Sequence, residues 1–125
     1  MMNPENAEIM IRKEYISSYI IYTLKKAKRI DILNSDIIKE IIEKDLSRIN
    51  NNKKIKLVIN LKGIKFIDSY GFRVLLELIG VSKIYKNPLY FSNISNEVKE
   101  LIQLLELKDI FYKREIIIPE DKIAA

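Results

Sequence analysis

An apolar run that turns directly into a helical pattern lies in the middle of the chain, at Leu57–Ile79. Its first five residues, Leu57–Leu61, are rich in β-branched side chains and predict a strand buried on both faces. After a polar interruption at 68–71, apolar residues recur at helical spacing. A strand that feeds a helix through a short polar turn leaves unpaired backbone N–H groups beside an exposed hydroxyl. We therefore look for function at this junction.

Length and composition limit the classes of protein that the chain can belong to. Its 125 residues predict a single domain, with a core at about 8–114, a loose N-terminal leader and a C-terminal tail. The sequence contains no cysteine and no histidine, which excludes disulfides and thiolate metal sites and disfavours hydrolytic triads and zinc chemistry. An enzyme is thus the least favoured class, and we expect no catalytic residues, no metal and no cofactor.

The charge is modestly basic, with 22 Lys and Arg against 17 Asp and Glu, a net charge of +5. This excess falls short of the concentrated basic face of a dedicated nucleic-acid binder. The run Lys25–Arg29 is interpreted as a solvated loop or strand extension rather than a phosphate- or lipid-facing patch, because no aromatic residues interleave with its charges. No apolar run is long enough to cross a bilayer and no signal peptide is recognised, so we expect a cytoplasmic protein.

The periodicity along the chain predicts alternating strands and helices. Strands are expected at 8–15, 19–24, 57–61 and 89–91, and 109–118 is interpreted as a last edge strand or a docking tail. Helices are expected after the candidate caps at 34–35, 68–69 and 93–95. The third helix is expected to bury Val98, Leu101, Ile102, Leu104 and Leu105. The order β-β-α-β-α-β-α-β favours an α/β fold, a sheet with helices packed against it.

The segment from Leu57 to Arg114 resembles the STAS domain, the fold shared by bacterial anti-sigma factor antagonists and the cytoplasmic tails of sulphate transporters. Asp68-Ser69-Tyr70-Gly71, within IKFIDSYGFRVLL, resembles the family's Asp-Ser-Ser/Thr-Gly. The stretches FSNISNEVKELIQLLEL and KDIFYKRE, and their spacing from Asp68, also match. Arg29–Asp31 resembles the family's Gly-x-Leu-Asp turn without its glycine. The resemblance implies a single-domain, STAS-like mixed β-sheet with helices packed against it.

The antagonist branch of the family implies a function for this junction. By resemblance, Ser69 is the phosphoacceptor, and the unphosphorylated protein sequesters an anti-sigma factor serine kinase, which releases sigma and so regulates transcription. Phosphorylation of Ser69 by that kinase, with ATP and magnesium that the kinase brings, breaks the complex, and a phosphatase resets it. The residues expected to bind the partner are Asp31, Asp68, Ser69, Tyr70, Gly71 and Phe72.

Plainer structural roles remain open for most of these residues. Ser69 and Asp68 could each be only a helix cap, and Asp31 could be only a turn-forming residue. Gly71 is expected to allow close packing of helix and strand rather than chemistry. Tyr70 departs from the family's small residue, and its ring could block a kinase or form part of a contact surface.

Two other functions are kept as alternatives. One is a structural STAS subunit of a transporter or signalling assembly, in which Ser69 is never modified. The other is a nucleic-acid or membrane-surface binder that uses Lys25–Arg29 and Lys53–Lys56, and we expect neither partner. Weak homodimerisation is left open. Glu106 replaces a glycine often seen before the final leucine, so that helix end must be satisfied by other means.

Overall fold

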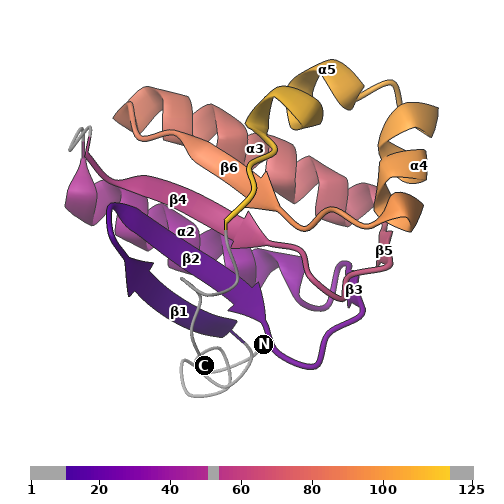
Figure 1. Ribbon diagram of the computed structural model, residues 1–125, viewed down its shortest axis with the longest axis horizontal. Coiled ribbons are helices and arrows are strands. Elements are labelled where there is room, and N and C mark those ends of the chain that lie inside the picture. The colour runs from indigo at the N-terminus through magenta and orange to yellow at the C-terminus, as the bar shows by residue number, and fades with distance from the viewer. Residues whose placement is uncertain (1–10, 51–53, 119–125) are drawn as a thin grey trace.

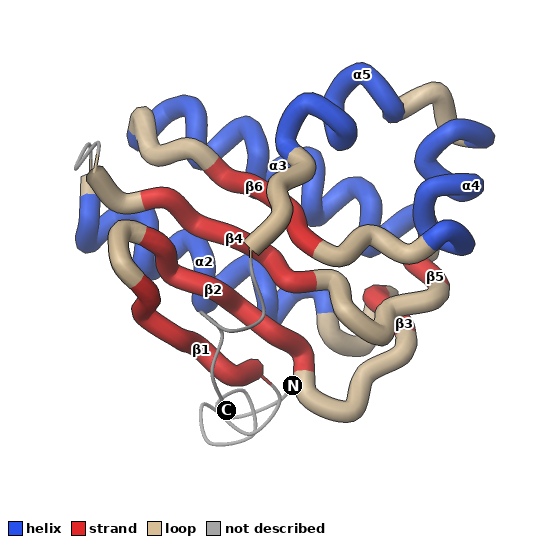
Figure 2. The backbone as a smooth tube through the Cα atoms, viewed as in Figure 1, coloured by secondary structure: helices blue, strands red, loops and turns tan. Residues whose placement is uncertain are grey.

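The computed structural model describes residues 11–50 and 54–118, and Figure 1 shows their arrangement as a sheet with helices against it. Within these residues, four strands form the main sheet, in the order β1-β2-β4-β6 (Figure 2). Strands β1 (Ile11–Ile16) and β2 (Tyr19–Leu24) form an antiparallel hairpin. Strands β4 (Lys56–Asn60) and β6 (Leu89–Ser92) continue the sheet in parallel. The predicted mixed sheet is confirmed.

A second, two-stranded sheet places the starts of two helices at one edge of the molecule. Strand β3 (Arg29–Ile30) pairs in parallel with β5 (Phe66–Ile67). Each strand leads into a helix: β3 into α2 (Ser35–Ile49) and β5 into α3 (Ser69–Tyr85). Because β3 and β5 are parallel neighbours, the N-termini of α2 and α3 lie at the same edge (Figure 1).

The core lies between the sheet and the pair α2 and α3, which cover one face of the sheet (Figure 1). Leu57 and Ile59 of β4 point into this core. Val58 points to the other face, where it packs with Ile21 and Ile118. The prediction that the central strand is buried on both faces is therefore confirmed.

The prediction of a strand at 109–118 is wrong. The segment begins as helix α5 (Lys108–Phe111) and the 3-10 turn η1 (Tyr112–Arg114), and a single bridge joins Glu115 to β6. The ring of Phe111 lies 5.8 Å from that of Phe72 and 5.1 Å from that of Phe91, so burial of an aromatic side chain overrides the β propensity of the local sequence. The docking-tail alternative fits better, because Ile118 is buried on the sheet.

The buried stripe predicted for the third helix is too long. Helix α4 (Asn96–Leu104) buries Val98 and Ile102, whereas Leu104 is 78% exposed. The helix ends at Leu104. Glu106, just beyond it, has a left-handed backbone with φ of 58°, and the Leu107 N–H bonds to the Ile102 carbonyl. This arrangement closes the helix end without glycine, and Leu104 and Leu105 are left exposed.

Candidate functional site

Ser69 is the first residue of α3 and is exposed. Asp68 is the cap: its carboxylate Oδ1 accepts a hydrogen bond from the Gly71 N–H at 2.7 Å. The Asp68 N–H donates in turn to the Ile30 carbonyl at 3.1 Å, which ties the start of α3 to the end of β3. Because Asp68 fills the capping position, the Ser69 hydroxyl faces outward from the first turn and is not the cap.

Gly71 lies where the start of α3 touches β3. A Cβ atom at this position would lie 2.7 Å from the Ile30 carbonyl oxygen and 2.9 Å from Cγ2 of Ile67. No side chain fits there without moving the backbone of β3. The expected packing role of Gly71 is confirmed.

Gly71 and Phe72 lie beneath the surface rather than on it. Both are buried, and the Phe72 ring, 3% exposed, meets Phe111 edge to face. A partner that docks on the outside cannot contact them directly. We therefore remove both residues from the contact surface expected from the sequence and assign them a supporting role.

The loop between β3 and α2 lies beside this junction and is held by its own polar side chains. Asp31 accepts from the Leu33 N–H at 2.9 Å and from Arg29 Nε at 2.8 Å. Asn34 accepts from the Asp31 N–H at 2.9 Å and donates to the Arg29 carbonyl at 2.8 Å. Asp31 thus has the turn-forming role that was the plainer alternative, and it is nearly buried.

This rigid loop exposes apolar side chains that the sequence analysis missed. Ile32 is 61% exposed and Leu33 is 82% exposed, and Phe66, from the neighbouring β5, is 40% exposed. We call these three residues the apolar rim. Since Asp31 and Asn34 fix the loop backbone, the two aliphatic side chains cannot turn inward. Exposed apolar side chains grouped beside a polar site are typical of a protein-binding surface.

Tyr70 is held to one side of the junction. Its hydroxyl donates to the carboxylate of Asp36, in the first turn of α2, at 2.9 Å to Oδ1. The guanidinium of Arg73 lies over the ring, 4.5 Å from its centroid. The ring therefore bridges the starts of the two helices.

The basic run Lys25–Arg29 is a solvated loop that leads into β3, as expected from the sequence. Lys25, Lys26 and Lys28 are exposed on the loop between β2 and β3, and Arg29 pairs with Asp31. The Lys28 carbonyl accepts from the Lys65 N–H at 2.7 Å.

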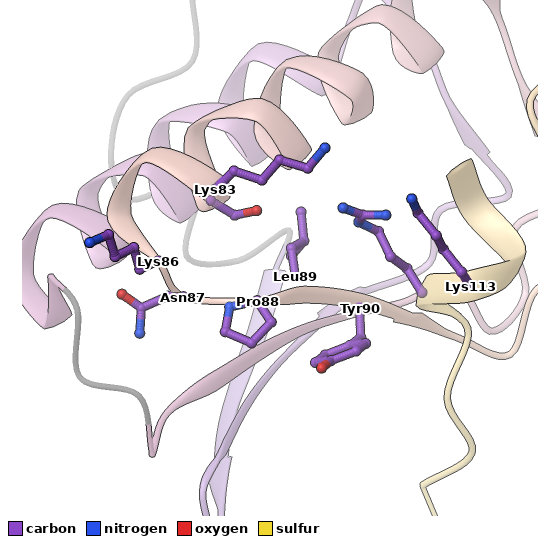
Figure 3. Close-up of a pocket in the computed structure, with 9 residues that line it drawn as sticks. Lys83, Lys86, Asn87, Pro88, Leu89, Tyr90 and Lys113 are labelled. Atoms are coloured by element: carbon purple, nitrogen blue, oxygen red, sulfur yellow. The ribbon is translucent and has the colours of Figure 1, made fainter. Parts of the chain in front are cut away.

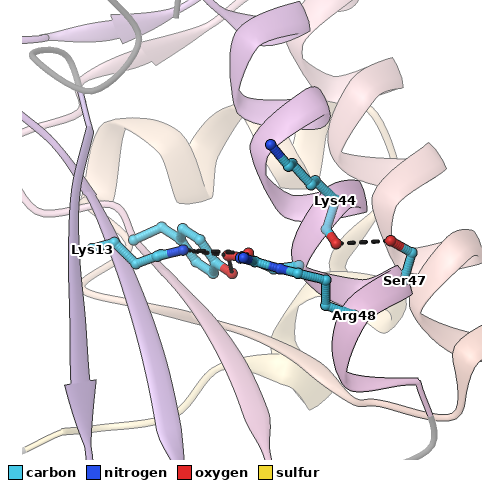
Figure 4. A network of polar contacts seen from close by, with 6 residues as sticks. Lys13, Lys44, Ser47 and Arg48 are labelled. Carbon is cyan, nitrogen blue, oxygen red and sulfur yellow. Dashed lines mark hydrogen bonds and ion pairs between the residues drawn. The ribbon is translucent and has the colours of Figure 1, made fainter. Parts of the chain in front are cut away.

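A second polar cluster joins α2 to the first hairpin, and the sequence analysis did not identify it. The buried carboxylate of Asp45 accepts from Tyr22 at 2.6 Å and from Lys13 at 3.0 Å, and it also pairs with Arg48. Figure 4 shows Lys13 and Arg48 reaching toward the same point from the strand and the helix. Burial raises the pKa of Asp45, but the three hydrogen bonds together outweigh it and hold the pKa below its ordinary value. We assign this cluster to holding α2 on the sheet.

The comparisons with known proteins agree on the fold. The model of the STAS domain family matches residues 11–120. The Bacillus cell fate determinant SpoIIAA, in its phosphorylated form, is similar with a TM-score of 0.64 and 14% identity, over 90% of this chain and 95% of that one. A putative anti-sigma factor antagonist from Thermotoga maritima has a TM-score of 0.70 and 16% identity, over 95% of this chain and 99% of that one.

A transporter is similar as well. The murine anion transporter Slc26a9 has a TM-score of 0.61 and 19% identity, and the match covers 98% of this chain but 19% of the transporter. None of the curated proteins matches the chain by sequence. Among residues 11–50 and 54–118, no helix has the length and hydropathy needed to cross a bilayer. At these identities the structural matches show a shared fold.

Proposed function

The chain belongs to the STAS domain family, and on that basis we propose that it is an anti-sigma factor antagonist, a binding module rather than an enzyme. In this proposal the unphosphorylated protein binds an anti-sigma factor serine kinase in the cytoplasm, and phosphorylation of Ser69 releases it. One observation carries the proposal. The Ser69 hydroxyl is exposed at the start of α3, beside the apolar rim of Ile32, Leu33 and Phe66.

The start of α3 suits a phosphate group. A phosphoserine carries nearly two negative charges at pH 7, and a helix N-terminus offers N–H donors and a favourable dipole. The N–H groups of Ser69 and Tyr70 have no carbonyl one turn back. Arg73, four residues after Ser69, lies on the same side of the helix and adds a positive charge there, although it also pairs with Glu77 at 3.5 Å. The neighbouring Asp68 carboxylate opposes these effects, so we expect phosphorylation to change the stability of the free protein little.

Phosphorylation of Ser69 would affect a complex with a bound partner much more strongly than the free protein. Packing over the apolar rim removes water from Ser69, and a new double charge there has no water to solvate it. Loss of a few well-packed contacts costs several kcal/mol, about a hundredfold to a thousandfold in affinity. The kinase supplies ATP and magnesium, and a phosphatase removes the phosphate. The switch therefore needs only one hydroxyl from this chain.

The test combines the purified protein with a candidate anti-sigma factor kinase and ATP and compares intact masses. We expect one added phosphate in the wild type and in Ser47→Ala, an exposed serine on α2, and none in Ser69→Ala. In the same experiment Leu33→Ala should weaken kinase binding about tenfold, since it removes the most exposed member of the rim. Failure of an otherwise active, bound kinase to modify the wild type would overturn the switch.

A second candidate is a structural STAS subunit that is never phosphorylated. Tyr70 favours it, because a bulky ring held at Asp36 replaces a small residue beside Ser69. The likeness to part of Slc26a9 shows that the fold also occurs inside a transporter. Tyr70→Ser separates the candidates: phosphate gained only by this variant identifies the ring as a block and favours the structural subunit.

A further inference from the structure

A cavity of about 430 Å³ lies at the opposite end of α3 from Ser69. It is formed by the end of α3, the start of β6 and the turn η1 (Figure 3). Its volume falls within the range of small-molecule sites in proteins. The residues that line it are Ser82, Lys83, Lys86, Asn87, Pro88, Leu89, Tyr90, Lys113 and Arg114.

The charged side chains that line this cavity are all positive. Lys83 from α3 and Lys113 from η1 extend over Leu89 toward the same space (Figure 3). Lys86 and Arg114 add two further cations, and no acidic side chain is among the lining residues. Within the described part of the chain, none of the three lysines forms a salt bridge. These cations come from separate elements, so the charge of the helix end alone does not explain their grouping.

The neutral polar groups of the wall are already used within the protein. Ser82 donates to the Ile79 carbonyl at 2.7 Å, and Asn87 donates to the Ile55 carbonyl at 3.3 Å. The Lys86 and Asn87 N–H groups close the last turn of α3 on the Ser82 carbonyl, which weakens the negative end of the helix dipole. Arg114 also donates one guanidinium N–H to the Ile110 carbonyl at 3.3 Å. The three lysines and the other guanidinium N–H groups of Arg114 are thus the groups that remain for a ligand.

Grouped cations of this kind repel one another, and an anion between them relieves that repulsion. Lysine and arginine bind phosphate through charge-assisted hydrogen bonds. The floor is different in character: Leu89 is buried, Tyr90 is half-buried, and Pro88 lies beside them. We propose that this cavity binds a small organic phosphate, with the phosphate group held by Lys83, Lys113 and Arg114 and an apolar or aromatic group beside Pro88 and Tyr90.

This site is separate from the proposed phosphoacceptor. Helix α3 has 17 residues and is therefore about 25 Å long, so the cavity and Ser69 lie at opposite ends of it. Ligand binding here does not depend on Ser69, and the two proposals fail or succeed independently. The size of the cavity favours a single small molecule over a nucleic-acid strand, which needs an extended basic groove.

The test is an NMR titration of the ¹⁵N-labelled full-length chain with phenyl phosphate at low ionic strength. We expect saturable shifts of the amides of residues 82–87, 89, 90 and 112–114, and unchanged amides at 68–71. Inorganic phosphate should bind about tenfold more weakly because it lacks the ring, and phenol should produce no shifts at these residues. Added salt should weaken phenyl phosphate binding because the site is electrostatic.

Matched variants make the result specific to the cavity. The pair Lys83→Gln and Lys113→Gln should weaken binding at least about tenfold. The pair Lys25→Gln and Lys44→Gln removes the same charge from exposed lysines outside the cavity and should leave binding unchanged. All four side chains are exposed, so unchanged thermal melting is the check on folding.

Three results would overturn the proposal. The first is no saturable shift around the cavity, and the second is equal weakening by the two pairs of variants. The third is tighter binding of a short single-stranded DNA or a phosphoserine peptide to the same amides, which would identify a macromolecular partner instead.

Discussion

The two ends of helix α3 differ in what their residues are required to do. At the first end Gly71 is pressed against the Ile30 carbonyl, Asp68 caps the helix, and the apolar rim lies beside it. At the last end Lys86 has a left-handed backbone, φ of 59°, and lies beside a cavity lined by further cations. One helix thus has the apolar rim beside its first end and a group of cations at its last end.

This difference shows that close packing limits which residue the first end can hold, whereas the last end is marked by its positive charge. At the first end the helical backbone conformation of Gly71 suits any residue. Glycine is nevertheless required, because a Cβ atom there would clash with β3. At the last end a lysine occupies a backbone conformation that glycine adopts most easily. Substitutions in α3 and at its two caps test this contrast, and the largest effect is expected at Gly71, where the packing is closest.

Gly71→Ala should have the largest effect, a loss of about 2 kcal/mol in the free energy of unfolding, because its Cβ must displace the backbone of β3. Gly80→Ala is the control on the same helix, since a Cβ there meets nothing within 4 Å. It should add up to about 1 kcal/mol through helix propensity. Urea unfolding measures both. Equal stabilities of the two variants would remove the packing explanation.

Asp68→Ala should cost about 1 kcal/mol, because the Gly71 N–H loses its acceptor at 2.7 Å. Ser69→Ala, one residue later, should change stability by less than about 0.5 kcal/mol, as for most exposed positions. Thermal and urea unfolding of the two variants separate the cap from the proposed phosphoacceptor. A comparable loss in Ser69→Ala would mean that the hydroxyl shares the capping role.

Lys86→Gly should raise stability by about 0.5 kcal/mol, the net of relieved left-handed strain and the greater freedom of glycine in the unfolded chain. Glu106→Gly, also at a left-handed helix end with φ of 58°, should have an effect of the same sign. Only Lys86→Gly should also weaken phenyl phosphate binding. A weakening by both variants would point to long-range charge or backbone effects rather than to the cavity.

Tyr70→Phe should have the smallest effect, a loss of a few tenths of a kcal/mol, because the hydrogen bond to Asp36 lies at the surface. A double-mutant cycle with Asp36→Asn isolates the interaction between the two side chains. A coupling energy near zero would show that the bond does not hold the starts of α2 and α3 together in solution.

Much of the site was predictable because its signals are local in the sequence. The strand 57–61, the helix after Ser69 and the glycine packing at position 71 each follow from residue order and spacing. The choice between Asp68 and Ser69 as the cap was not predictable. It depends on the Ile30 carbonyl, which fixes Asp68 from nearly forty positions away in the chain.

The errors share a physical cause. The segment 109–118 has strand propensity, but Phe111 gains more by packing against Phe72 and Phe91 than by extending. The apolar rim was missed because Ile32 and Leu33 have the composition of core residues, and only the fixed loop turns them outward. Similarly, the basic cavity unites Lys83 with Lys113 across thirty positions.

By itself the sequence determined the alternation of strands and helices and the polar junction at Ser69, because periodicity, propensity and capping act between residues close in the chain. Only the tertiary structure decided which side chains are presented together: the rim beside Ser69, and the cations at the far end of α3. Such groupings arise from the packing of separate elements, and packing is a property of distances in space that residue order does not contain.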